Sequence, residues 1–233
     1  MNKKKLPSSA ALVFVLGCAV LLSASCRVEN TSVDERERVG PGGAEAPGRT
    51  VLPVNQIVTP AGILVALPGM RPQALALSPD EKLLAVSGKT HELVLIDPAD
   101  GRILQRVALP ARADEPEAPD APTPNILRPD TKGQLSYTGL LFTPDGRRVY
   151  LSNVNGDIKV FAVREDGSVA PSRAIALPPA DAPRRSEEIP AGLALSADGR
   201  LLYVCGNLSN RLLEMDTETG ALLRAFDVGV TPF

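Results

Sequence analysis

One phrase occurs three times along this chain, and it constrains the fold more than any other feature. It reads LSPDEKLLAVSGK from Leu77, FTPDGRRVYLSNV from Phe142 and LSADGRLLYVCGN from Leu195. The units that contain it span Pro72–Pro110, Tyr137–Pro178 and Pro190–Phe233, and each is about 40 residues long, a period typical of propeller blades. The sequence therefore predicts an all-β fold, a β-propeller of four-stranded antiparallel blades.

Local patterns within the units support this prediction. Asp145-Gly146 and Asp198-Gly199 are tight-turn signals, because glycine accepts the positive φ that such turns require. The first unit has Asp80-Glu81 there and must turn without glycine. Because these aspartates recur at equivalent positions, we interpret them as turn residues and not as parts of an active site. In the third unit the predicted strands are Ala191–Ser196, Leu201–Cys205, Leu212–Met215 and Leu222–Val228.

The number of units raises a question about ring closure. Residues Asn55–Pro72 resemble the back half of another blade, so we count about three full blades plus a partial one. Closed rings need about four to eight blades. We expect the chain to be the front part of a longer protein, which we favour, or an open arc completed by a partner.

The N-terminus has the order of a bacterial signal peptide: three lysines, an apolar run and small residues. We predict a signal peptide over residues 1–25, a flexible linker over 26–51 and the propeller over 52–233. Cys26 follows the apolar run, so either it is lipid-modified or ordinary cleavage occurs after Ser25. The predicted location is periplasmic or extracellular, with membrane attachment only through such a lipid anchor.

The repeats resemble those of YVTN-type β-propellers. The family is named after a Tyr-Val-Thr-Asn tetrad. Its counterpart here is Tyr150-Leu151-Ser152-Asn153 and, with one inserted residue, Tyr203–Asn207, whereas the first unit departs further from the tetrad. The resemblance implies an exported binding or scaffold domain. It also leaves a hydrolase open, either a lactonase-like enzyme or a propeller placed before an alkaline-phosphatase-type phosphoesterase domain. The catalytic residues of that domain would not lie in this chain.

Binding is predicted on the face that bears two enlarged loops, Ala111–Ser136 and Pro179–Ile189, because insertions on one face of a repeat array often mark its binding face. Loops joining the second and third strands share that face. Asparagines there can bind ligands or simply form turns. The candidate binding residues are Tyr137, Asn153, Asn155, Arg184, Arg185, Asn207 and Asn210.

Composition argues against several function classes. With 25 basic and 27 acidic side chains, the chain shows no basic excess, and we predict no nucleic-acid partner. The single histidine, His91, is predicted to lie exposed in a turn, and we assign no catalytic residue, metal site or cofactor to this chain. Cys205 lies in an apolar strand pattern and is predicted to be a buried, inert thiol.

Overall fold

The computed structural model describes residues 40–41, 50–52, 56–59, 61–112, 129–180 and 182–229. The predicted signal peptide and Cys26 lie outside these ranges. The chain divides into two compact units, Met1–Gly62 and Ile63–Phe233. In the first, β1 (Gly40–Pro41), β2 (Thr50–Val51) and β3 (Ile57–Val58) form a small antiparallel sheet, so two short strands lie within the segment predicted to be a linker.

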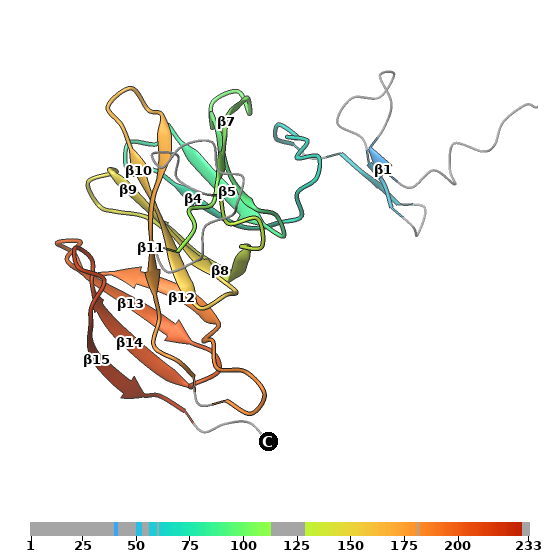
Figure 1. Cartoon of the computed structure of the whole chain (residues 1–233). Helices are drawn as coiled ribbons and strands as arrows, with labels where there is room; N and C mark the ends of the chain where they lie inside the picture. The colour runs from blue at the N-terminus through green and yellow to red at the C-terminus, as the bar shows by residue number, and fades with distance from the viewer. Residues whose placement is uncertain are drawn as a thin grey trace, which may run out of the picture. The chain divides into compact units, whose positions relative to one another are not determined.

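The second unit contains three four-stranded antiparallel sheets, each paired in chain order as a meander (Figure 1). We call them blades 1, 2 and 3. Blade 1 has β4 (Pro72–Leu77), β5 (Leu84–Gly88), β6 (Glu92–Ile96) and β7 (Ile103–Ala108). Blade 2 has β8 (Leu135–Phe142), β9 (Arg148–Asn153), β10 (Asp157–Val163) and β11 (Val169–Ala176). Blade 3 has β12 (Pro190–Leu195), β13 (Leu201–Gly206), β14 (Arg211–Asp216) and β15 (Leu222–Asp227). The predicted fold class and the third-unit strands are confirmed.

The repeated phrase forms the same turn in every blade. In blade 3, Ser196 Oγ donates to Asp198 Oδ1 at 2.6 Å and accepts from the Leu201 amide at 2.9 Å. Ser78 with Asp80 and Thr143 with Asp145 repeat the arrangement in blades 1 and 2. The predicted turn role of the three aspartates is confirmed. Each hydroxyl and carboxylate satisfies groups that close the hairpin between the first and second strands.

The position after this aspartate adopts positive φ in all three blades. It is +70° at both Gly146 and Gly199, and +59° at Glu81. Glycine takes this conformation without steric cost, whereas a residue with a Cβ does not. Blade 1 therefore makes the same turn with a disfavoured residue, as the sequence predicted.

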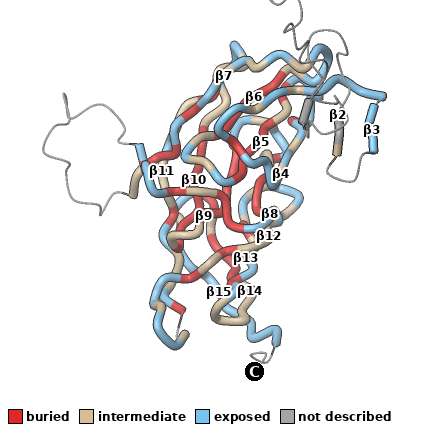
Figure 2. Tube along the Cα trace, turned by 90° about the vertical axis from the view of Figure 1, so that its right-hand side faces the viewer, coloured by how far each residue is buried: buried red, intermediate tan, exposed pale blue. Residues whose placement is uncertain are grey.

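Apolar cores join neighbouring blades. Blade 1 packs against blade 2 through side chains that include Leu93, Leu95 and Phe161, and blade 2 packs against blade 3 through side chains that include Tyr150 and Leu202. The first strands β4, β8 and β12 make the most extensive contacts between blades, as the innermost strands of a propeller do. Buried residues accordingly concentrate at these inter-blade layers (Figure 2).

The segment 63–70 packs on the face of blade 1 that is turned away from blade 2. Val65, Leu67 and Met70 cover Val86 and Ile96 of that blade. The Val65 side chain also lies against Gly101, just as Ile175 of blade 2 lies against Gly220 of blade 3. The segment therefore takes the place of an outer strand from a preceding blade, as predicted, although no strand is assigned to it.

The two ends of the three-blade arc leave apolar side chains in solvent. Leu75 of β4 is 69% exposed, and Phe226 of β15 is 40% exposed. Cys205 is a free thiol and is exposed, so the prediction that it is buried is wrong. Its strand does bury Leu202 and Val204 against blade 2, but Cys205 points to the opposite face, which no described residue covers.

Candidate functional site

The predicted binding residues come from one end of the blades. In an antiparallel meander, the loop entering the first strand and the hairpin joining the second and third strands lie at the same end. We call this end the loop face. It contains the described part of the first enlarged loop (111–112 and 129–136), the second loop without residue 181, and the hairpins 153–157 and 206–211.

A buried charge network holds the blade 2 part of the loop face. Lys159 is fully buried, and its Nζ lies 2.8 Å from Asp130 Oδ2 and 3.0 Å from Asp157 Oδ2. Asn153 Nδ2 donates to Asp157 Oδ1 at 2.8 Å, and its Oδ1 accepts from the Gln134 amide at 2.9 Å. Asp130 also accepts from the Gly133 amide at 2.7 Å. The network ties the entry loop to the β9–β10 hairpin.

The pKa values of the two carboxyl groups of this network, Asp130 and Asp157, are shifted in opposite directions. Burial raises the pKa of Asp157, an effect that the charge and hydrogen bond of Lys159 only partly offset. Burial also acts to raise the pKa of Asp130. For this group, however, the hydrogen bond and charge of Lys159, with the amides of Lys132 and Gly133, hold the pKa below its ordinary value. The lysine is thus balanced by Asp130 as a stable anion.

A second buried carboxylate organises the blade 3 part of the loop face. Glu188 Oε1 accepts from the amides of Ile189 at 2.9 Å and Leu208 at 2.8 Å, and Oε2 accepts from the Ser209 amide at 3.2 Å. Arg185 reaches back to blade 2, where its guanidinium donates to the Val154 carbonyl. The second enlarged loop therefore fixes both neighbouring hairpins.

Tyr137 and Asn207 meet above this framework. Asn207 Nδ2 donates to the Tyr137 hydroxyl at 3.1 Å, although the two residues belong to different blades. Tyr137 has φ of +53° and is 52% exposed. A left-handed conformation costs a residue with a Cβ about 1–2 kcal/mol. Such strain beside an exposed aromatic ring is typical of a functional position.

The remaining candidates take different roles. Asn153 is fully buried, and its side chain amide is engaged with Asp157 and the Gln134 amide. Asn155 is at the surface and donates weakly to the Lys132 carbonyl at 3.4 Å. Arg184 and Asn210 have positive φ, +74° and +55°, and Arg184 is exposed. The loop face thus brings together the exposed residues Tyr137, Arg184 and Asn207 and half-buried Asn155 over buried anchors.

Sequence reasoning missed the anchors Asp130, Lys159 and Glu188. One signal for Lys159 was present: aligned on the repeated turn, it takes the position of Val94 and Leu213, which are both buried. A lysine at a buried repeat position implies carboxylate partners. One partner, Asp157, lies two residues earlier in the same strand, whereas the other, Asp130, comes from the entry loop, which the alignment does not specify.

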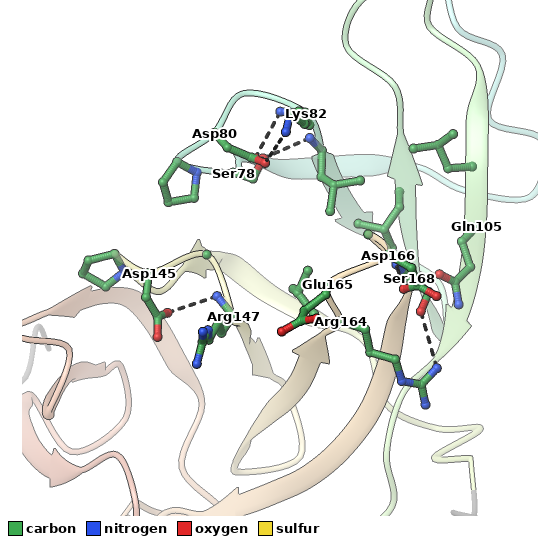
Figure 3. A pocket seen from close by; sticks show the side chains of 18 residues that line it. Ser78, Asp80, Lys82, Gln105, Asp145, Arg147, Arg164, Glu165, Asp166 and Ser168 are labelled. Atoms are coloured by element: carbon green, nitrogen blue, oxygen red, sulfur yellow. Dashed lines mark hydrogen bonds and ion pairs between the residues drawn. The ribbon is translucent and has the colours of Figure 1, made fainter.

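A cavity of about 700 Å³ lies at the opposite end, between blades 1 and 2 (Figure 3). Its walls carry the repeated turns of both blades and the turn between β10 and β11. Leu83, Leu95 and Val163 supply apolar surface, and Arg147 and Glu165 supply charge. Gln105 closes one side by pairing with the Val169 amide and carbonyl at 2.9 and 2.7 Å.

His91 is exposed, as predicted, and its Nδ1 lies 2.8 Å from the carbonyl oxygen of Gly133, to which it donates. Over the described ranges, His, Cys, Asp and Glu side chains form no group of three or more that could hold a metal ion. The described residues also include no helix of the length and apolarity needed to span a bilayer.

Comparisons with known proteins bear on the fold. No family model and no curated protein matches the chain. Solved structures similar to it include hydrazine synthase from Kuenenia stuttgartiensis, with 19% identity, a TM-score of 0.46 and coverage of 71% of this chain and 38% of that chain. U3-55K gives 12% identity, a TM-score of 0.49 and coverage of 72% and 42%. The WD40 repeats of RRP9 give 12% identity, a TM-score of 0.50 and coverage of 72% and 41%.

The RRP9 comparison supports the fold alone. The chain has the architecture of part of a WD40-like β-propeller. It spans about two fifths of the length of the solved chains named above.

Proposed function

We propose that this chain is an exported β-propeller domain of the YVTN-repeat type, and that it recognises a ligand on its loop face. The observation that carries the proposal is the strained, exposed Tyr137 bonded to Asn207 across two blades. Binding residues held on rigid supports lose little freedom when a ligand arrives. Here buried Lys159 and Glu188 provide that support.

The chemistry of Tyr137, Asn155 and Asn207 favours a neutral, hydroxyl-rich ligand such as an oligosaccharide. The Tyr137 ring offers an apolar surface with a polar tip. The amides of Asn155 and Asn207 each offer donors and an acceptor, which pair with hydroxyl groups. The Asn155 amide now makes only a long hydrogen bond of 3.4 Å, and the Asn207 amide donates to the Tyr137 hydroxyl at 3.1 Å; a ligand can replace both bonds.

An array of immobilised oligosaccharides tests this proposal. The full chain is applied in parallel with Tyr137→Asn, which removes the ring but suits positive φ. We expect binding by the parent chain and loss of at least about tenfold in affinity for the variant, equivalent to about 1.4 kcal/mol. Arg164→Ala, in the cavity at the opposite end, is the matched control.

Two results would contradict the loop-face assignment. Unchanged binding by the Tyr137→Asn variant would show that Tyr137 is not part of the binding site. Binding that is lost in Arg164→Ala but kept in Tyr137→Asn would move the site to the cavity between blades 1 and 2. Its volume of about 700 Å³ is in the range of small-molecule sites.

Export has its own test. We expect the chain to leave the cytoplasm of a bacterial host and to lose its first residues. The mass of the mature N-terminus distinguishes lipid modification of Cys26 from plain cleavage after Ser25. Incorporation of labelled fatty acid that disappears in Cys26→Ser would establish the lipid anchor. Retention of an intact N-terminus in the cytoplasm would contradict export.

A further inference from the structure

A repeated inter-blade contact points to an unfilled docking surface on blade 3. Gln105 of β7 pairs with Leu95, and its side chain bonds the backbone of Val169 in the next blade. Arg173 of β11 pairs with Val160, and its guanidinium donates to the carbonyls of Thr217 and Glu218, both at 2.5 Å. In blades 1 and 2, the fourth strand thus supplies one side chain that ties its blade to the backbone of the next blade.

Arg224 is the equivalent side chain in blade 3. It pairs across β14 and β15 with Glu214, the position that corresponds to Leu95 and Val160. Instead of reaching another blade, it makes a bidentate ion pair with Glu214, with distances of 2.9 and 2.6 Å, and lies over the Phe226 ring. Its side chain is 61% exposed.

The surroundings of Arg224 repeat an interface that is buried elsewhere in the chain. We call the side chains of Tyr203, Cys205, Leu212, Arg224 and Phe226 the open face. The positions equivalent to Cys205 are Ser87 and Ser152, which are fully buried by the next blade. Those equivalent to Phe226 are Val107 and Ile175, each only 4% exposed. The open face is therefore the equivalent surface of blade 3, which no blade among the described residues covers.

We propose that the open face docks a further four-stranded antiparallel blade, and that Arg224 ties it to the carbonyls of that blade's turn between the third and fourth strands. The intact junctions between blades 1, 2 and 3 show what covers this surface. A second copy of the chain fits less well. Its blade 1 already carries Val65, Leu67 and Met70 on the face that would have to dock.

The experiment replaces residues 230–233 of the chain with a copy of its own residues 179–229. Cys18→Ser and Cys26→Ser, together with Cys205→Ser in the appended copy, leave the original Cys205 as the sole thiol. Its reaction with a disulfide reagent then reports whether the open face is covered. We expect fast labelling in the unextended chain and labelling slowed at least about tenfold in the extended chain, because a covered thiol reacts only through local opening.

Variants separate the role of Arg224 from general packing. In the original blade 3 of the extended chain, Arg224→Gln should retain the slow labelling, because Gln105 ties blade 1 to the backbone of blade 2. Arg224→Leu should lose at least half of the slowing. A control copy carrying aspartates through Leu202→Asp and Val204→Asp, on its docking face, should leave Cys205 as reactive as in the unextended chain.

The proposal fails under any of three results. Cys205 could label equally fast with and without the appended copy. The copy could add no β signal in circular dichroism, which would show that the open face does not support a blade. Finally, the unextended chain could sediment as a dimer with Cys205 protected, which would assign the surface to a second copy.

Discussion

At the scale of single residues, the chain depends on polar groups that reach their partners only after folding. Lys159 is the extreme case, because it is fully buried between two aspartates. Removing one partner of a buried ion pair leaves an unpaired charge in a medium that solvates it poorly. Lys159 therefore stabilises the fold mainly because, without it, two buried carboxyl groups would lack a cation.

We predict that Lys159→Met lowers the free energy of unfolding by about 3–5 kcal/mol, because Asp130 and Asp157 would remain buried without a cation. Urea denaturation followed by circular dichroism measures the change. Lys132→Met, at an exposed position of the same loop, should stay within about 0.5 kcal/mol of the parent chain. Equal effects of the two substitutions would contradict the network.

The turn aspartates give stability a defined pH dependence. Hydrogen bonds from Ser78, Thr143 and Ser196 are the main cause that lowers the pKa of Asp80, Asp145 and Asp198 respectively. A lowered pKa in the folded state stabilises the fold above the unfolded value of about 3.9, and this contribution disappears as pH falls through the folded value. We expect Asp198→Asn to be less stable than the parent at pH 6. The gap should close below about pH 4, as measured by urea titrations at each pH.

Because the repeated turns require a positive φ, adding a Cβ at this position and removing one should change the free energy of unfolding in opposite directions. Glu81 has a positive φ of +59°, close to the +70° of Gly199. We predict that Gly199→Ala lowers the unfolding free energy by about 1–2 kcal/mol. Glu81→Gly should raise it by less than about 1 kcal/mol, because greater freedom of the unfolded chain offsets part of the relief. Thermal unfolding of both variants measures the pair, and a loss of stability in Glu81→Gly would count against the interpretation.

At the scale of elements, the hairpins of the loop face are positioned by the loop before them. Glu188 bonds three backbone amides, two of which belong to the β13–β14 hairpin. Glu188→Ala should lower the unfolding free energy by about 3 kcal/mol, since it leaves these three partly buried donors unpaired. Hydrogen exchange should then lose protection at Leu208 and Ser209 first. Glu187→Ala, an exposed neighbour, is the matched control and should leave both amides protected.

The elements also show how far sequence reasoning extends. Alternating apolar residues and turn glycines predicted the strands of blade 3 to within about two residues at their ends, because these signals are local. Glu188 and Asp130 escaped prediction because their partners are distant in sequence. Cys205 was mispredicted for a related reason: a strand pattern shows which residues can be buried, whereas burial also needs a covering sheet. The pairing of Tyr137 with Asn207 likewise depends on the contact between two blades.

At the scale of the whole molecule, three blades in series have only two full blade-to-blade junctions. In such arrays each module is stabilised by its own sheet and by its immediate neighbours. Blade 2 has a neighbour on both faces, and blade 1 has blade 2 and the 63–70 segment. Among the residues that the structure describes, blade 3 has one neighbour, and every residue of its last strand is exposed. Stability should therefore fall from the middle of the arc toward blade 3.

This arrangement predicts which blades lose stability when a junction between two blades is weakened. Leu202→Ala at the junction of blades 2 and 3 should cost about 2–5 kcal/mol and release blade 3 selectively. Phe161→Ala at the junction of blades 1 and 2 removes support from both sides and should destabilise the whole unit. Native-state hydrogen exchange separates the two results: in Leu202→Ala the amides of β13 and β14 lose protection while those of β5 and β6 keep it. Uniform loss in both variants would show that the three blades unfold as one cooperative body, so that an unpaired edge would not weaken blade 3 alone.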